Sequence, residues 1–154
     1  MKLFSRVATL LLASVLSVSA WAAGATKAEA QAQSSAALAH VKKVGPEQAI
    51  KDFNSAPDWK IKGININFVD MKGVVLARSL NERLVGKNTY ESKDPNGKEF
   101  VKEFIATVQK DKNGGWVDYQ FINPESKKLE DRAMFVRKVD GFDGFIAVAI
   151  SSAK

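Results

Sequence analysis

The residues best suited to contact a small molecule lie in one short predicted strand near the middle of the chain, residues 114–124. Its period-two alternation places Val117, Tyr119 and Phe121 on one face and Trp116 on the other. A Tyr-x-Phe pair on a covered face can stack on a ligand and also donate a hydrogen bond from the phenol. On the strand alone, the simpler interpretation is that these aromatic side chains belong to the core.

A cation ends another predicted strand. Residues 64–78 alternate apolar and polar side chains and turn near Gly73, which predicts a hairpin that closes at Arg78. Arg78 can either hold an anion or lie at the solvated rim of the sheet, and both interpretations stay open at this stage.

Other chemistry has little support in the sequence. The chain has no cysteine, and its single histidine, His40, lies in a helical surface pattern where we expect it to be solvated. A metal site, a Ser-His-acid set and a phosphate-binding glycine loop are therefore not expected. We predict no catalytic residues, no cofactor and no enzyme activity.

The first 22 of the 154 residues resemble a secretory signal peptide. Lys2 and Arg6 precede an apolar run, and Ala20-Trp21-Ala22 forms a small-x-small cleavage site. We therefore expect a periplasmic protein, with an uncleaved N-terminal anchor as the alternative. Removing residues 1–22 would lower the net charge from +6 to about +4. No block of five like charges appears, so nucleic acid is not an expected partner.

The remaining chain predicts an α+β domain. Residues 23–44 are rich in alanine and predict a helix with a thin apolar stripe over 25–43, which can pack on a sheet, fray or pair with a second copy as a homodimer. A single domain is expected over residues 45–154. Its further elements are helices at 46–54 and 98–109, the hairpin, a central strand at 116–122, and strands at 132–139 and 145–150.

Several ordered segments together resemble a single Cache domain of the second type, the PAS-like extracellular sensor module of bacterial chemoreceptors and sensor kinases. The resemblance covers roughly residues 45–150 and depends on the order and spacing of its motifs, any one of which would be weak evidence. The matching segments are Phe53-Asn54, residues 67–77 (NFVDMKGVVLA), 84–88 (LVGKN), 94–101 (DPNGKEFV), 115–119 (GWVDY), Asn123-Pro124 and 135–143 (FVRKVDGFD).

The resemblance implies a five-stranded antiparallel sheet with a long N-terminal helix on one face. On the other face it implies a ligand pocket under residues 80–110. Family ligands are commonly short carboxylates, and the family positions that meet them match Tyr119 and Arg132 here. A phenol and a guanidinium can supply the donors and the cation that a carboxylate needs. We add Phe121, Trp116 and Arg78 as candidate ligand-binding residues.

This chain also differs from the family pattern. Phe121 stands where a second aromatic with a donor is frequent, and Arg78 stands where a histidine is usual. The ligand's identity therefore stays open. No membrane helix or signalling helix follows the last predicted strand, so we expect a stand-alone secreted version of the module.

Two functions remain. The leading hypothesis is a periplasmic protein that binds a small organic anion and presents the result to a membrane receptor or sensor kinase. The alternative is a structural or interaction module whose pocket is filled by its own side chains, with the N-terminal helix docking on a membrane partner.

Overall fold

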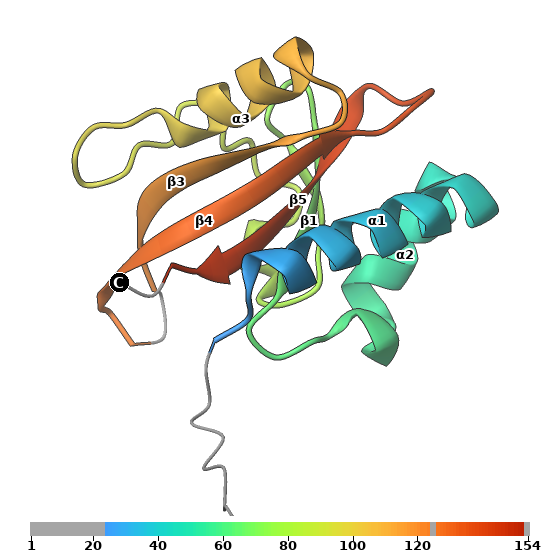
Figure 1. Cartoon of the computed structure of the whole chain (residues 1–154), viewed down its shortest axis with the longest axis horizontal. Helices are drawn as coiled ribbons and strands as arrows, with labels where there is room; N and C mark the ends of the chain where they lie inside the picture. Colours follow the sequence, from blue (N-terminus) through green and yellow to red (C-terminus); the bar gives the residue numbers. More distant parts are fainter. Residues whose placement is uncertain (1–23, 124–125, 153–154) are drawn as a thin grey trace, which may run out of the picture.

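Five antiparallel strands form one sheet in the spatial order β2-β1-β5-β4-β3 (Figure 1). The computed structural model describes residues 24–123 and 126–152 of the chain. The strands are β1 Asn65–Asp70, β2 Val75–Arg78, β3 Gly115–Ile122, β4 Leu129–Lys138 and β5 Gly144–Ser151. The predicted α+β class and five-stranded antiparallel sheet are confirmed. The strand from the middle of the chain, β3, is an edge strand of the sheet, and β5 occupies the centre of the sheet.

Helices cover both faces of this sheet (Figure 1). On one face lie α1, Lys27–Val44, and α2, Pro46–Ser55, followed by a short 3-10 turn at Pro57–Trp59. On the other face lies α3, Phe100–Lys110, reached through a second 3-10 turn at Glu82–Leu84 and a long connection. The expected arrangement, with the long N-terminal helix on one face and the 80–110 segment on the other, is therefore present.

The start of α1 is defined by local hydrogen bonds. Thr26 and Glu29 form a capping box, in which each side chain accepts a hydrogen bond from the backbone N–H of the other residue. The helix then buries the small residues Ala30 and Ala37 and the larger Val41 near its C-terminal end. Small side chains on this stripe let α1 lie close against β5, which holds a weakly amphipathic helix in place.

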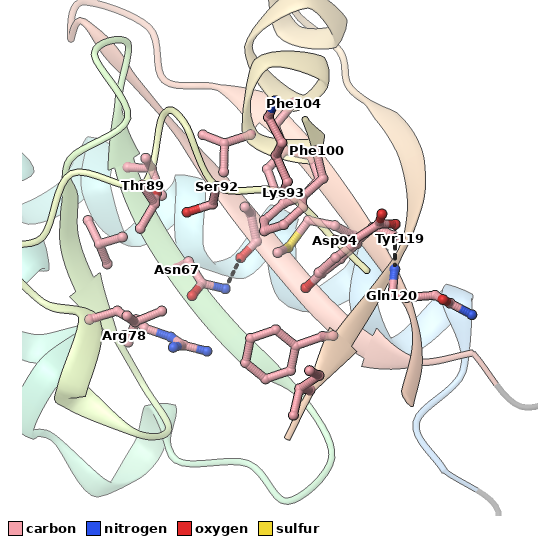
Figure 2. A pocket seen from close by; sticks show the side chains of 18 of the residues that line it. Asn67, Arg78, Thr89, Ser92, Lys93, Asp94, Phe100, Phe104, Tyr119 and Gln120 are labelled. Carbon is pink, nitrogen blue, oxygen red and sulfur yellow. Dashed lines mark hydrogen bonds between the residues drawn. The ribbon is translucent and has the colours of Figure 1, made fainter. Parts of the chain in front are cut away.

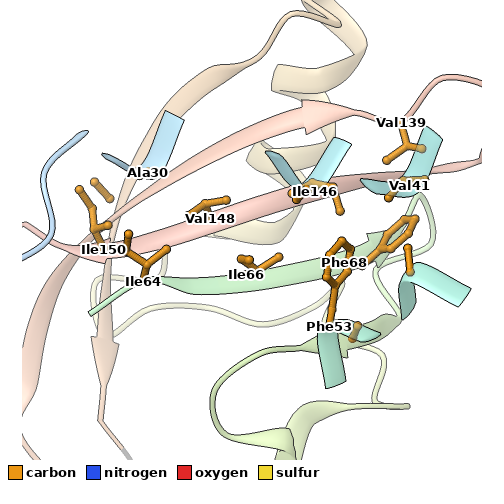
Figure 3. Packing of buried hydrophobic residues seen from close by; sticks show 14 residues of the cluster. Ala30, Val41, Phe53, Ile64, Ile66, Phe68, Val139, Ile146, Val148 and Ile150 are labelled. Carbon is orange, nitrogen blue, oxygen red and sulfur yellow. The ribbon is translucent and has the colours of Figure 1, made fainter. Parts of the chain in front are cut away.

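The two faces of β5 carry side chains of different size. Toward α1 and α2 it presents Ile146, Val148 and Ile150, which pack with Phe53 and Phe68 in a dense cluster (Figure 3). Toward α3 it presents Phe145, Ala147 and Ala149. The central strand is therefore bulky on one side and small along much of the other, so space is left on the α3 side.

His40 is not solvated as expected. Its Nε2 lies 2.6 Å from Oδ2 of Asp52, which joins α1 to α2. Its ring also lies 5.0 Å from the Trp59 ring and 5.8 Å from the Phe53 ring. The helical pattern of α1 does not reveal this position, because the covering residues come from the two segments that follow.

The predicted signal peptide at residues 1–22 lies outside the described residues. Within residues 24–123 and 126–152, no helix combines the length and the apolar content that a membrane crossing requires.

Candidate ligand-binding site

A cavity of about 510 Å³ lies on the α3 side of the sheet, under the connection between β2 and α3 (Figure 2). All five strands contribute to its floor. Its polar lining includes Asn67, Arg78, Thr89, Ser92, Asp94 and Tyr119, and its apolar lining includes Val75, Phe100, Val101, Phe104, Phe121 and Met134. This size is within the range of small-molecule sites in proteins.

The hollow follows from the small side chains of the central strand. Ala147 lies on the cavity floor and is almost fully buried. It pairs with Asn67 on one side and with Val136 on the other, so it lies in the middle of the sheet. A leucine or isoleucine at this position, as on the opposite face of β5, would extend into the space that the cavity occupies.

Arg78 brings an unpaired cation to this cavity. Its backbone N–H donates to Oδ1 of Asn54 at 2.9 Å, which ties the end of β2 to α2. Its buried Nε has no hydrogen-bond partner, and no carboxylate of the described residues lies within ion-pair distance of its guanidinium. Burial lowers the pKa of Arg78, the nearby Tyr119 raises it and Arg132 lowers it. A guanidinium stays protonated in proteins, so Arg78 brings a half-buried positive charge to the cavity that no described carboxylate compensates.

Tyr119, on β3, lines the same cavity as Arg78. Its ring stacks on Phe100 at 4.7 Å and meets Phe104 edge-on at 5.5 Å, so α3 fixes its orientation. Figure 2 shows its side chain extending into the cavity. Burial raises the pKa of Tyr119 to about 12, against smaller lowering effects of Arg132 and Arg78. The phenol is therefore protonated at neutral pH and is available as a hydrogen-bond donor.

Arg132 lies next to Tyr119 but is already paired. The two residues face each other across β3 and β4. The Nη2 of Arg132 donates to Oε2 of Glu130 at 2.6 Å, while its buried Nε has no partner. Arg132 lines a neighbouring hollow of about 360 Å³ that shares Arg78, Tyr119 and Phe121 with the main cavity. The arginine predicted from the family resemblance therefore lines the same neighbouring hollow as Arg78, with its charge balanced by Glu130.

Trp116, the fifth candidate residue, lies apart from this group and does not line the cavity. It packs on the α1 side of the sheet, 5.1 Å from the Phe135 ring, with the Lys27 ammonium 4.9 Å above its own ring. The reason is strand alternation, because Trp116 faces the opposite side from Val117 and Tyr119. The structure thus brings together Arg78, Tyr119, Phe121 and Arg132 and separates Trp116 from them.

Asn67 is a lining residue that the sequence analysis did not single out. Its amide nitrogen donates to the carbonyl oxygens of Asn65, at 3.2 Å, and Ala147, at 3.1 Å. Only 6% of its surface is exposed. The signal was present in the alternating hairpin, because a polar face on a sheet that is covered on both sides cannot be solvated and has to line a site or bond internally.

Asp94 is a second lining residue that the sequence analysis did not single out, and it holds the 94–98 turn against β3 at the cavity. Its carboxylate accepts backbone N–H bonds from Asn96, Lys98 and, at 3.3 Å, Gln120 of β3. Burial alone would raise the pKa of Asp94, but the backbone bonds from Lys98, Gln120 and Asn96 together outweigh it, and the pKa is lowered. The ionised carboxylate thus connects the start of the 94–98 turn to the edge of the sheet (Figure 2).

Metal ligands do not gather at this site. Within the described part of the chain, no three His, Cys, Asp or Glu side chains lie close enough together to hold a metal ion. His40 lies on the α1 side of the sheet, away from the cavity lining.

A five-stranded antiparallel sheet with helices on both faces and a cavity between sheet and connection defines a PAS-like sensor module. The family model of the single Cache domain 2 matches residues 22–152 of the chain. The chain therefore belongs to the single Cache domain family, whose members are extracellular ligand-sensing modules. Comparison with curated proteins gives no match.

Solved structures share this fold at low sequence identity. A methyl-accepting chemotaxis protein from Vibrio parahaemolyticus is 17% identical, with a TM-score of 0.67 over 81% of this chain and 87% of that one. A periplasmic sensor domain of a chemotaxis protein is 20% identical, with a TM-score of 0.66 over 82% and 94%. A Cache chemosensory domain described as recognising carboxylic acid is 16% identical, with a TM-score of 0.62 over 80% and 88%.

Proposed function

We propose that this protein binds a small carboxylate in the periplasm and reports its presence to a membrane receptor or sensor kinase, without catalysing a reaction. The observation that carries the proposal is Arg78, a half-buried arginine in the wall of a cavity of about 510 Å³, whose buried Nε has no hydrogen-bond partner and whose guanidinium has no acidic partner among the described residues. A carboxylate of the ligand would compensate this charge.

The neighbours of Arg78 support the same ligand chemistry. Tyr119 supplies a protonated phenol, and the Nε of Arg132 is a second unpartnered donor close to it. The similar Cache domain that recognises carboxylic acid supports the ligand class, and the chemotaxis sensor domains support a membrane receptor as the partner.

The alternative of a filled pocket finds less support. Phe121 and Met134 line the cavity without closing it. An interaction role of α1, through pairing with a second copy or docking on a partner, is compatible with ligand binding.

The experiment is a ligand panel on the purified protein. Acetate, propionate, pyruvate and lactate are tested by calorimetry and thermal unfolding, with acetamide and propionamide as neutral controls of the same shape. A ligand present at 100 times its Kd should stabilise the protein by about 2.7 kcal/mol. The absence of heat and of any melting-temperature shift with every carboxylate would contradict the proposal. Sequencing the N-terminus of exported protein separates cleavage after Ala22 from an uncleaved anchor.

A further inference from the structure

The cavity is much larger than a two-carbon or three-carbon acid requires. Acetate has four heavy atoms, which fill roughly 120 Å³ at about 30 Å³ for each water-sized group. The cavity measures about 510 Å³. A six-carbon ring fits an apolar cavity of about 150 Å³. The space therefore holds a carboxylate head and a tail the size of a ring together.

The lining is divided in the way such a molecule would need. Figure 2 shows Arg78 at one end of the cavity and Tyr119 across from it, where the Tyr119 ring stacks on Phe100 of α3. Phe100 and Phe104 form an apolar wall where α3 covers the cavity. If the carboxylate of a ligand binds at Arg78, the rest of that ligand molecule contacts this apolar wall.

The charged side chains around the cavity favour a ligand that carries a single negative charge. Among the described lining residues, Arg78 is a cation with no carboxylate in reach, whereas Lys93 lies 3.4 Å from Glu99. In the neighbouring hollow Arg132 is paired with Glu130. The lining also contains the Asp94 carboxylate, whose field would oppose a second negative charge on the ligand.

We infer that the ligand is a monocarboxylate with an apolar tail of about five to eight carbons, alkyl or aromatic, its head at Arg78 and Tyr119 and its tail against Phe100 and Phe104. This inference rests on the proposed function and narrows its ligand class. Burial of the tail provides the affinity that a small, strongly hydrated acid lacks.

The test is a chain-length series measured by calorimetry on the unmodified protein. The series is acetate, butanoate, hexanoate, octanoate and 3-phenylpropanoate, with hexan-1-ol as the neutral match and adipate as the dianion. Each methylene that enters the cavity is expected to tighten binding about fourfold up to hexanoate or beyond. Hexan-1-ol and adipate are expected to bind at least tenfold more weakly than hexanoate.

The possible results separate the two proposals. Affinity that stays flat or falls beyond propionate, or adipate binding as tightly as hexanoate, would overturn this inference and leave a short-acid sensor intact. Binding of no carboxylate at all would overturn both.

A tail-blocking variant locates the binding. Val75→Phe places a ring in the apolar part of the cavity and is expected to weaken hexanoate at least tenfold while changing acetate less than threefold. Val85→Phe, at a half-exposed valine that does not line the cavity, is the matched control. Equal hexanoate affinity in the folded Val75→Phe variant would place the tail elsewhere and overturn the inference; if that variant does not fold, the ligand series still decides.

Discussion

Arg78 and Tyr119 lie on the two opposite edge strands of the sheet, β2 and β3, and line the same cavity. Each is accompanied by a cross-strand neighbour, Asn67 beside Arg78 and Arg132 beside Tyr119. Sheets twist, and long side chains from the two edges can then approach each other over a middle of small residues. The small side chains of Ala147 and Ala149, between these two strands, therefore leave the space that forms the cavity.

Replacing Arg78 separates stability from binding. Arg78→Met removes a buried charge that no described carboxylate compensates, so the free energy of unfolding of the ligand-free protein is expected to rise by about 1 kcal/mol or more. The same variant should lose its carboxylate-dependent stabilisation. Chemical unfolding with and without ligand measures both quantities. Arg83→Met, at an exposed position, is the control, and a variant at Arg78 that still binds with wild-type affinity would refute the assigned role.

Filling the floor of the cavity should remove binding without unfolding the protein. Ala147→Leu adds its side chain on the cavity side of β5 and is expected to change stability by less than about 1.5 kcal/mol, because space is available. Ala133→Leu, on the densely packed side, is expected to cost about 1–3 kcal/mol by overpacking. Denaturation midpoints and ligand calorimetry of both variants test this difference in stability. An equal loss of stability in the two variants would contradict the prediction.

Tyr119 should ionise late. Its pKa of about 12 lies above the ordinary value of 10, so the folded state keeps the proton where the unfolded state releases it. The contribution of Tyr119 to stability is thus fully present below pH 10 and is lost as pH rises from 10 toward 12. Ultraviolet titration of the two tyrosines should show a phenolate step near pH 12 that is missing in Tyr119→Phe. A Tyr119 phenolate that forms near pH 10 in the folded protein would show that the ring is not enclosed.

Ligand binding should not depend on Tyr119 ionisation at physiological pH. Because the phenol is protonated well above neutrality, affinity for a carboxylate is expected to be constant between pH 6 and pH 9 as far as this residue is concerned. Tyr119→Phe keeps the stacking on Phe100 and removes only the donor, so a loss of about 0.5–1.5 kcal/mol of binding free energy is expected by calorimetry.

His40 should matter for stability although it is remote from the site. His40→Ala removes the hydrogen bond to Asp52 and the ring contacts with Trp59 and Phe53. A loss of about 1–3 kcal/mol in the free energy of unfolding is expected, with ligand affinity unchanged. Lys43→Ala on the exposed side of α1 is the control. Unfolding at the wild-type midpoint would mean that the α1–α2 contact adds nothing.

Much of this architecture could be predicted from local patterns. Period-two alternation located the strands, and the 3.6-residue stripe located α3, because side-chain direction is fixed by the backbone geometry of one segment. The start and end of β4 were less accurate: the strand begins at Leu129, three residues before the expected Arg132. A change from turn to strand inside a polar segment produces no hydrophobic signal.

What the sequence determined by itself is which side chains share a face, namely Tyr119 with Phe121 and Trp116 opposite them. What the tertiary structure decided is which faces meet. In the folded protein β3 lies at an edge of the sheet, Asn67 lines the cavity and His40 contacts Asp52. Arg78 and Tyr119 line the same cavity although three strands separate β2 from β3. Local alternation is a property of the backbone within one segment, whereas strand order and the volume left between layers depend on how distant segments pack against each other.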